Sequence, residues 1–153
     1  MFEARAKWIR LLIILAVLPA LGGSSHSRTV SDTREKIVLT AAERERLLSG
    51  MRTYLKSIEG IVEGLASNRL DRVRASALKS GKALLGDVDP ALALAIPMSF
   101  SLMSLDTHEK FDALAAKAGQ KAAKTEILRD LSVILGICTG CHATFRVVPA
   151  KQK

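Results

Sequence analysis

The residues most able to do chemistry in this chain lie close together near its end, in the run Cys138-Thr139-Gly140-Cys141-His142. On a helix, positions i, i+3 and i+4 share one face, so both thiols and the imidazole can address one flat partner. A Cys-x-x-Cys-His box is typical of covalent c-type haem attachment, in which the thiols add to the vinyl groups and the imidazole ligates the iron. We therefore predict one covalent haem c, held by Cys138, Cys141 and His142, with His142 as the proximal iron ligand.

Other uses of such a box fit the chain less well. A structural zinc site usually needs four ligands, often including a second Cys pair, and this chain has two Cys and three His in total. A thioredoxin-like Cys-x-x-Cys belongs near a βαβ pattern, whereas this box continues a helical pattern. A structural disulfide would close a very small loop and would leave His142 without a role. Nothing beside the box forms an acid–base constellation, so we do not expect an enzyme.

The first 25 residues resemble a secretory signal. Arg5, Lys7 and Arg10 form a basic start, residues 11–18 are continuously apolar, and residues 19–24 are mostly small or helix-breaking. The apolar run is far shorter than the roughly 20 residues that a membrane span needs. We predict a cleaved signal peptide over 1–25 and a periplasmic protein, with an uncleaved anchor as the alternative.

The composition of the chain is strongly basic, with 23 Lys and Arg against 15 Asp and Glu. Such a surface favours acidic partners or anionic lipid. Because no nucleic-acid recognition motif is present and the protein is expected to be exported, we do not expect nucleic acid as a partner. The length that remains after the predicted signal peptide suits one domain with one core.

The spacing of apolar residues predicts an all-α chain. Thr40 and Glu43 form a capping box, and an inward stripe with alternating three- and four-residue spacing follows it, which predicts a helix over 41–66. Further helices are expected over 68–86, from Asp89-Pro90 to Pro97 (short), from about 106 to Gly119, and from about 121–125 to 145. We expect 26–39 to be a flexible arm, 98–104 an apolar loop, 40–148 the folded domain, and 149–153 a basic tail. The architecture predicted is an antiparallel four-helix bundle with the haem in its core, near the last helix.

On these residues the chain resembles the cytochrome c prime superfamily. The resemblance rests on the extended box Cys141-His142-Ala143-Thr144-Phe145-Arg146 and on the segment Ile61-Val62-Glu63-Gly64 of the first helix. It covers about residues 40–148. It implies a haem-carrying four-helix bundle, and it implies that a homodimer through the first two helices is possible.

The resemblance also implies that the distal side of the iron decides the function. Low-spin relatives carry a methionine of the first helix as sixth ligand and transfer electrons, whereas five-coordinate relatives place an apolar side chain there and bind small gases. Met51 lies on the inward stripe, and its thioether is a good ligand for haem iron. Leu48 better matches the family's distal register, and Leu55 is the third residue expected to line the distal side.

We therefore predict a periplasmic one-electron carrier with His142 and Met51 as iron ligands, served by a redox partner with an acidic docking face. The alternative is a five-coordinate haem module that binds gases such as NO or CO, with Leu48 over the iron. Arg146 is expected beside the haem or a propionate, or as a solvated cation at the helix end. Met98, Met103 and His108 are further ligand candidates. Apolar packing is the other role for the two methionines, and a hydrogen-bonded core position is the other role for the histidine.

Overall fold

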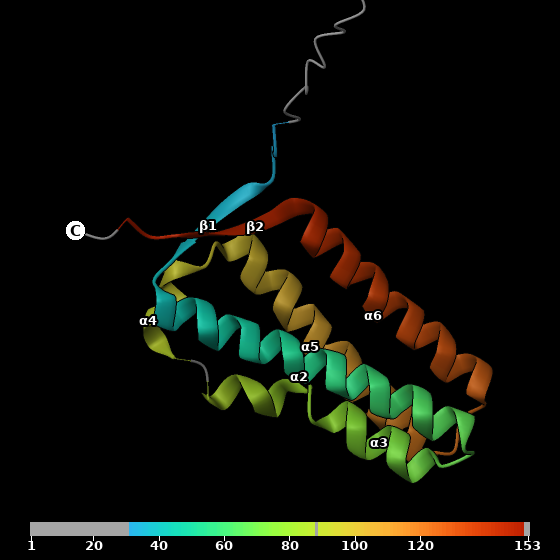
Figure 1. The fold of residues 1–153 in the computed structure, drawn as a ribbon. Coiled ribbons are helices and arrows are strands. Elements are labelled where there is room, and N and C mark those ends of the chain that lie inside the picture. Colours follow the sequence, from blue (N-terminus) through green and yellow to red (C-terminus); the bar gives the residue numbers. More distant parts are fainter. Residues whose placement is uncertain (1–30, 88, 152–153) are drawn as a thin grey trace, which may run out of the picture. The chain divides into compact units, whose positions relative to one another are not determined.

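Figure 1 shows the computed structural model of the chain, which describes residues 31–87 and 89–151. The chain divides into two units, Met1–Asp32 and Thr33–Lys153, and every element described belongs to the second. The predicted signal peptide over 1–25 and the beginning of the predicted arm lie outside the described residues. Within the described part, the fold is mostly helical with a small two-stranded sheet.

The element order explains how the ends of this unit meet. Strand β1 (Glu35–Leu39) precedes α2 (Ala41–Ala66), and strand β2 (Phe145–Pro149) follows directly on the last helix. Between them lie α3 (Leu70–Leu78), the 3₁₀ helix η1 (Lys82–Asp87), α4 (Pro90–Ala95), α5 (Met98–Gly119) and α6 (Lys124–Thr144). β1 and β2 pair in parallel, at the end of the unit where α2 begins and α6 ends (Figure 1).

The strand β1 corrects two expectations. Residues 35–39 form a strand and are not part of a flexible arm, so the chain is not all-α. Ile37 and Leu39 are buried, while their neighbours Lys36 and Val38 are exposed. That alternation is the period-2 pattern of a half-buried strand, and it escaped notice because it spans only five residues. Ile37 and Val38 lie in register with Val147 and Val148 of β2. The predicted basic tail therefore begins at the last residue of a strand.

The first helix forms where the sequence predicts it. Thr40 accepts a hydrogen bond from the amide of Glu43, and the Glu43 carboxylate accepts one from the amide of Thr40, which completes the expected capping box at the start of α2. The helix buries Ile61, Leu65 and two small positions against α3. At one of these, Gly64, an added Cβ would lie 2.8 Å from a methyl carbon of Val73, so only glycine permits this close approach.

Three predicted element boundaries are wrong. Residues 98–104 are not a loop but the first turns of α5, since Pro97 is extended and starts the helix at Met98. The segment 68–86 breaks into α3 and η1. Asn68 does not cap α3, because its φ of 56° places it in the left-handed turn that ends α2.

The packing of the helices creates two apolar clusters. α2 packs on α3, α3 on α5, and α5 on α6. The larger cluster joins all four of these helices and includes Ile61, Val73, Phe111, Leu114, Ile127 and Ile134. The smaller cluster lies at the sheet and includes Ile37, Leu39, Leu92, Phe100 and Phe145, with Met51 and Cys141 packed against it. The Cys-x-x-Cys-His box lies where these two clusters meet, because Cys138 packs against the larger one.

Candidate functional site

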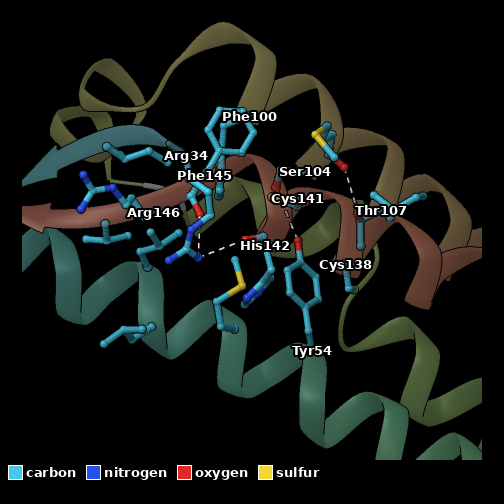
Figure 2. A pocket seen from close by; sticks show the side chains of 17 residues that line it. Arg34, Tyr54, Phe100, Ser104, Thr107, Cys138, Cys141, His142, Phe145 and Arg146 are labelled. Carbon is cyan, nitrogen blue, oxygen red and sulfur yellow. Dashed lines mark hydrogen bonds between the residues drawn. The ribbon is translucent and has the colours of Figure 1, made fainter. Parts of the chain in front are cut away.

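A cavity of about 310 Å³ lies between α2, α5, α6 and the sheet, at the level of the Cys-x-x-Cys-His box (Figure 2). Its volume is at the lower end of the range of about 300–1,000 Å³ found for ligand and cofactor pockets. Most of its walls are aliphatic, aromatic or thioether side chains. These are Ile37, Leu47, Leu48, Met51, Tyr54, Phe100, Met103, Ile137, Phe145 and Val147.

All three residues of the predicted attachment site line this cavity. Cys138, Cys141 and His142 come from the last two turns of α6, where the i, i+3 and i+4 spacing puts them on one helix face. Both cysteines are free and half-buried, whereas His142 is exposed. Within the described residues, the imidazole of His142 makes no hydrogen bond to another side chain.

The environment of the two thiols disfavours thiol–disulfide exchange. Burial raises the pKa of Cys138, and burial together with the neighbouring Cys138 raises the pKa of Cys141. An exchange-active cysteine needs the opposite, a lowered pKa that supplies thiolate at neutral pH. In the described part of the chain, no three His, Cys, Asp or Glu side chains are arranged to hold a metal ion directly. The raised pKa values of the two thiols are therefore the opposite of those of an exchange-active pair.

The wall opposite the box comes from α2. Met51 and Leu48 both line the cavity, together with Leu47 and Tyr54. Leu55 does not line it; its side chain is 68% exposed. The prediction for Leu55 is wrong because the inward face of α2 continues through Tyr54 and Ile58, and position 55 turns about one hundred degrees away from position 54.

Met98 and Met103, the two further methionines considered as iron ligands, differ in their positions relative to the cavity. Both belong to α5, so neither packs in the predicted loop. Met103 lines the cavity, and its methyl carbon is the nearest atom, at 3.9 Å, to a Cβ placed on Gly140 of the box. Met98 is 73% exposed and lies outside the cavity. Met103 is therefore a second thioether in the cavity wall, and Met98 is not.

His108 does not line the cavity. It is buried in the body of the molecule, where Nδ1 lies 2.8 Å from the carbonyl oxygen of Ser80 and Nε2 lies 2.7 Å from the hydroxyl of Tyr54. The interpretation of His108 as a core histidine held by hydrogen bonds is confirmed. Its Tyr54 partner is a cavity residue that the sequence analysis missed, although it follows Met51 by three positions on the same helix.

The end of α6 is held by a residue from the other end of the unit. The guanidinium of Arg34 donates hydrogen bonds to the backbone carbonyls of His142, at 3.1 Å, and Phe145, at 3.5 Å (Figure 2). Arg146 also lines the cavity, but it lies on β2 and not one turn further along the helix, because α6 ends at Thr144. Arg34 was not recognised in the sequence because nothing local relates it to the box.

Among the described residues, α6 is long and apolar enough to cross a membrane by length and composition alone. Helices in the cores of soluble proteins meet the same criterion. Here α6 packs against α5 and buries Ile127, Leu131 and Ile134. At least part of the apolar surface of α6 is therefore buried in the protein core.

The residues of this cavity fit a c-type haem. The two thiols and the imidazole do not converge on one point, as a directly bound metal ion would require, but they face one apolar cavity from one helix. A thioether, Met51, is part of the opposite wall.

No family model, curated protein or solved structure matches this chain.

Proposed function

We propose that this protein is a c-type cytochrome that carries one covalent haem and transfers single electrons. One observation carries the proposal: the two thiols and the imidazole of a Cys-x-x-Cys-His box and the thioether of Met51 all line the same apolar cavity. Covalent haem attachment gives each of these four groups a role. A zinc site or a redox thiol pair would leave the Met51 side and the apolar walls without a purpose.

Each group has a definite task in this proposal. Cys138 and Cys141 anchor the cofactor as thioethers, and His142 supplies the proximal nitrogen ligand. Met51 would supply a sulfur ligand, and His/Met ligation would give a higher reduction potential than ligation by two nitrogens. The haem supplies an iron that alternates between two oxidation states. Ile37, Phe100 and the other apolar residues of the walls would lower the polarity around the cofactor.

The alternative function is a gas-binding haem module. Leu48 supports this alternative, because it lines the cavity together with Met51 and offers an apolar side chain for the distal side. In that case Met51 packs beside the cofactor, and the iron has an open position for NO or CO. The two functions differ in a single contact, which makes them easy to separate by spectroscopy.

The proposal also covers the fold type, the cellular location and the partners of the protein. We assign the mostly helical unit to the four-helix bundle type of cytochrome and the chain to the periplasm, since residues 1–25 have the composition of a cleaved secretory signal. The full chain has a net charge of +8, and cleavage after residue 25 removes three basic residues and one acidic residue, which leaves +6. Such a charge suits a redox partner with an acidic docking face. A homodimer is compatible with the family resemblance. The protein is proposed to be a carrier and not an enzyme.

The test is to express the full chain in a bacterial host that matures c-type cytochromes and to purify it from the periplasm. The proposal expects one haem per chain that survives denaturing electrophoresis. It also expects a low-spin ferrous spectrum and the long-wavelength charge-transfer band of His/Met ligation in the ferric form. A protein without covalent haem would overturn the proposal, whereas a high-spin haem that binds CO at once would select the gas-binding alternative.

A further inference from the structure

A tyrosine and a histidine form a buried hydrogen-bonded pair at the wall of the cysteine cavity. The hydroxyl of Tyr54, on α2, lies 2.7 Å from Nε2 of His108, on α5. His108 is only 4% exposed, whereas Tyr54 also lines the cavity that contains Cys138 and Cys141. The pair thus reaches from the protein interior to the proposed cofactor site. Tyr54 is the single tyrosine of the chain.

The direction of the hydrogen bond follows from the other side of the imidazole. Nδ1 of His108 lies 2.8 Å from the main-chain carbonyl oxygen of Ser80, which can only accept a hydrogen bond. Nδ1 therefore carries the proton of the neutral ring, and Nε2 offers a lone pair. It follows that the phenol of Tyr54 donates to Nε2. The base and the acidic proton already face each other at hydrogen-bonding distance.

The surroundings of Tyr54 hold the phenol in this position. Its ring stacks on Phe111 with centroids 5.7 Å apart and planes inclined by 5°, and it meets the ring of His108 at 5.2 Å. The hydroxyl of Ser104 lies further away, at 3.5 Å from the phenol oxygen (Figure 2). Burial raises the pKa of Tyr54, so the phenol and not the phenolate is the resting form. A neutral phenol that loses an electron becomes a strong acid, and its proton must then leave.

We propose that Tyr54 is a second redox site of this protein, which gives one electron to a strong oxidant in or near the cysteine cavity while its proton passes to His108. In this step the O–H bond of Tyr54 breaks and a bond forms between that proton and Nε2 of His108. Tyr54 becomes a neutral phenoxyl radical, His108 becomes an imidazolium, and the oxidant is reduced by one electron. The carbonyl of Ser80 stabilises the imidazolium through its bond to Nδ1–H. Electron return reverses every change.

The oxidant is a one-electron acceptor stronger than a phenoxyl radical, such as a small oxygen-centred radical that enters the cavity. The inference goes beyond electron carriage by the proposed haem, because it adds a redox group made of protein alone. It does not depend on the axial ligands of the iron. An external oxidant can therefore test it whether or not the proposed function holds.

The experiment is a flash photolysis of the purified full-length protein with a ruthenium polypyridyl complex and an electron-accepting quencher, followed by freeze-quench electron paramagnetic resonance. Any haem is kept ferric, and any free thiols are blocked by alkylation. The wild type is expected to give a neutral tyrosyl radical. Because Tyr54 is the single tyrosine of the chain, the Tyr54→Phe variant should give no such radical. Its formation should also be slower in D₂O, because a proton moves with the electron.

The His108→Gln variant removes the base while retaining a side chain that can form hydrogen bonds. Radical formation is expected to slow by about a hundredfold, at the lower end of what a positioned base contributes. Ser104→Ala, which removes the longer contact to the same hydroxyl, is the matched control and should leave the rate unchanged. Circular dichroism checks that each variant is folded.

Two results with the wild type alone would overturn the inference. One is the absence of a tyrosyl radical while the ruthenium oxidant is fully consumed, and the other is a radical that forms at the same rate in H₂O and D₂O. A radical whose rate is the same in folded His108→Gln would also overturn the role of His108. The absence of haem from the protein would refute the proposed function and would leave this test intact.

Discussion

The guanidinium of Arg34 donates a hydrogen bond of 3.1 Å to the backbone carbonyl of His142, across 108 positions of the sequence. The last carbonyls of a helix have no partner within the helix, and a cation is favoured at this negative end of its dipole. Arg34 thus satisfies the backbone of the very residue whose side chain is proposed to ligate iron. The residue before β1 is in this way connected to the end of α6.

We expect Arg34→Ala to lower the free energy of unfolding by about 1 kcal/mol, the typical net value of a hydrogen bond. Amide hydrogen exchange of residues 144–146 should become faster at the same time. Denaturant titrations measure the first effect and exchange mass spectrometry the second. Arg44→Ala is the matched control, since Arg44 is an exposed arginine of α2 whose side chain forms no ion pair among the described residues. Equal results for both variants would show that the Arg34 contact contributes nothing.

The strand β1 is expected to be a structural part of the domain and not a dispensable arm. Ile37 is 1% exposed, so Ile37→Ala should destabilise the protein by about 2–5 kcal/mol, as for other buried aliphatic truncations. Val38→Ala, one residue further and 54% exposed, should cost about 0.5 kcal/mol or less. Thermal or denaturant unfolding compares the two. If the two variants were equally stable, β1 would not be packed as the structure has it.

Covalent attachment is predicted to depend on both cysteines. Cys138→Ala and Cys141→Ala should each abolish or greatly weaken haem retention on a denaturing gel, because each removes one thioether. Thr139→Ala, between them on the exposed face of the same helix, should retain full haem staining. A wild-type protein without haem staining would refute the attachment site and the proposed function with it.

Met51 decides between the electron carrier and the gas-binding module. Met51→Ala should remove the long-wavelength band of the ferric protein and open the iron to CO, because a methyl group cannot reach the metal. Met98→Ala is the matched control, since Met98 is 73% exposed and lies outside the cavity. Met103→Ala tests the second thioether of the cavity wall. If only Met103→Ala removed the band, Met103 and not Met51 would be the ligand.

The buried phenol of Tyr54 predicts a loss of stability at alkaline pH. Its pKa is raised in the folded protein above the ordinary value of 10.0 because of burial. The folded state therefore binds the phenolic proton more tightly than the unfolded state, and this contribution is complete below pH 10 and is lost as the pH rises through the folded pKa. The difference in unfolding free energy between wild type and Tyr54→Phe should become less favourable to the wild type above about pH 10. A difference that is independent of pH would contradict this.

The sequence predicts the helices and the box well because both depend on local spacing. The capping box of Thr40 and Glu43 and the apolar period of 41–66 specify α2 to the residue. The position of Cys138, Cys141 and His142 on one helix face likewise needs only the helical repeat. Such features involve partners at most a few positions apart.

Features that depend on distant partners could not be predicted in this way. The pairing of 35–39 with 145–149, the contact of Arg34 with His142 and the bond between Tyr54 and His108 each join elements that are far apart in sequence. Leu55 was misplaced for a related reason. A stripe with three- and four-residue spacing covers a broad face, and only the neighbouring helices decide which part of that face meets the cavity.

The parallel pairing of β1 with β2 also constrains the order in which the chain can mature. The partner of the first strand is the last strand, so about the whole length of the domain must be closed as one loop, at an entropic cost that the local helices do not have. In the export that we propose, the sheet cannot form until residue 149 has crossed the membrane, and the box, which precedes β2, has then crossed as well. Until then Cys138, Cys141 and His142 belong to an open chain end without the backbone contacts of Arg34. For the haem attachment that we propose, this interval would give an attachment enzyme access to both thiols before the sheet closes.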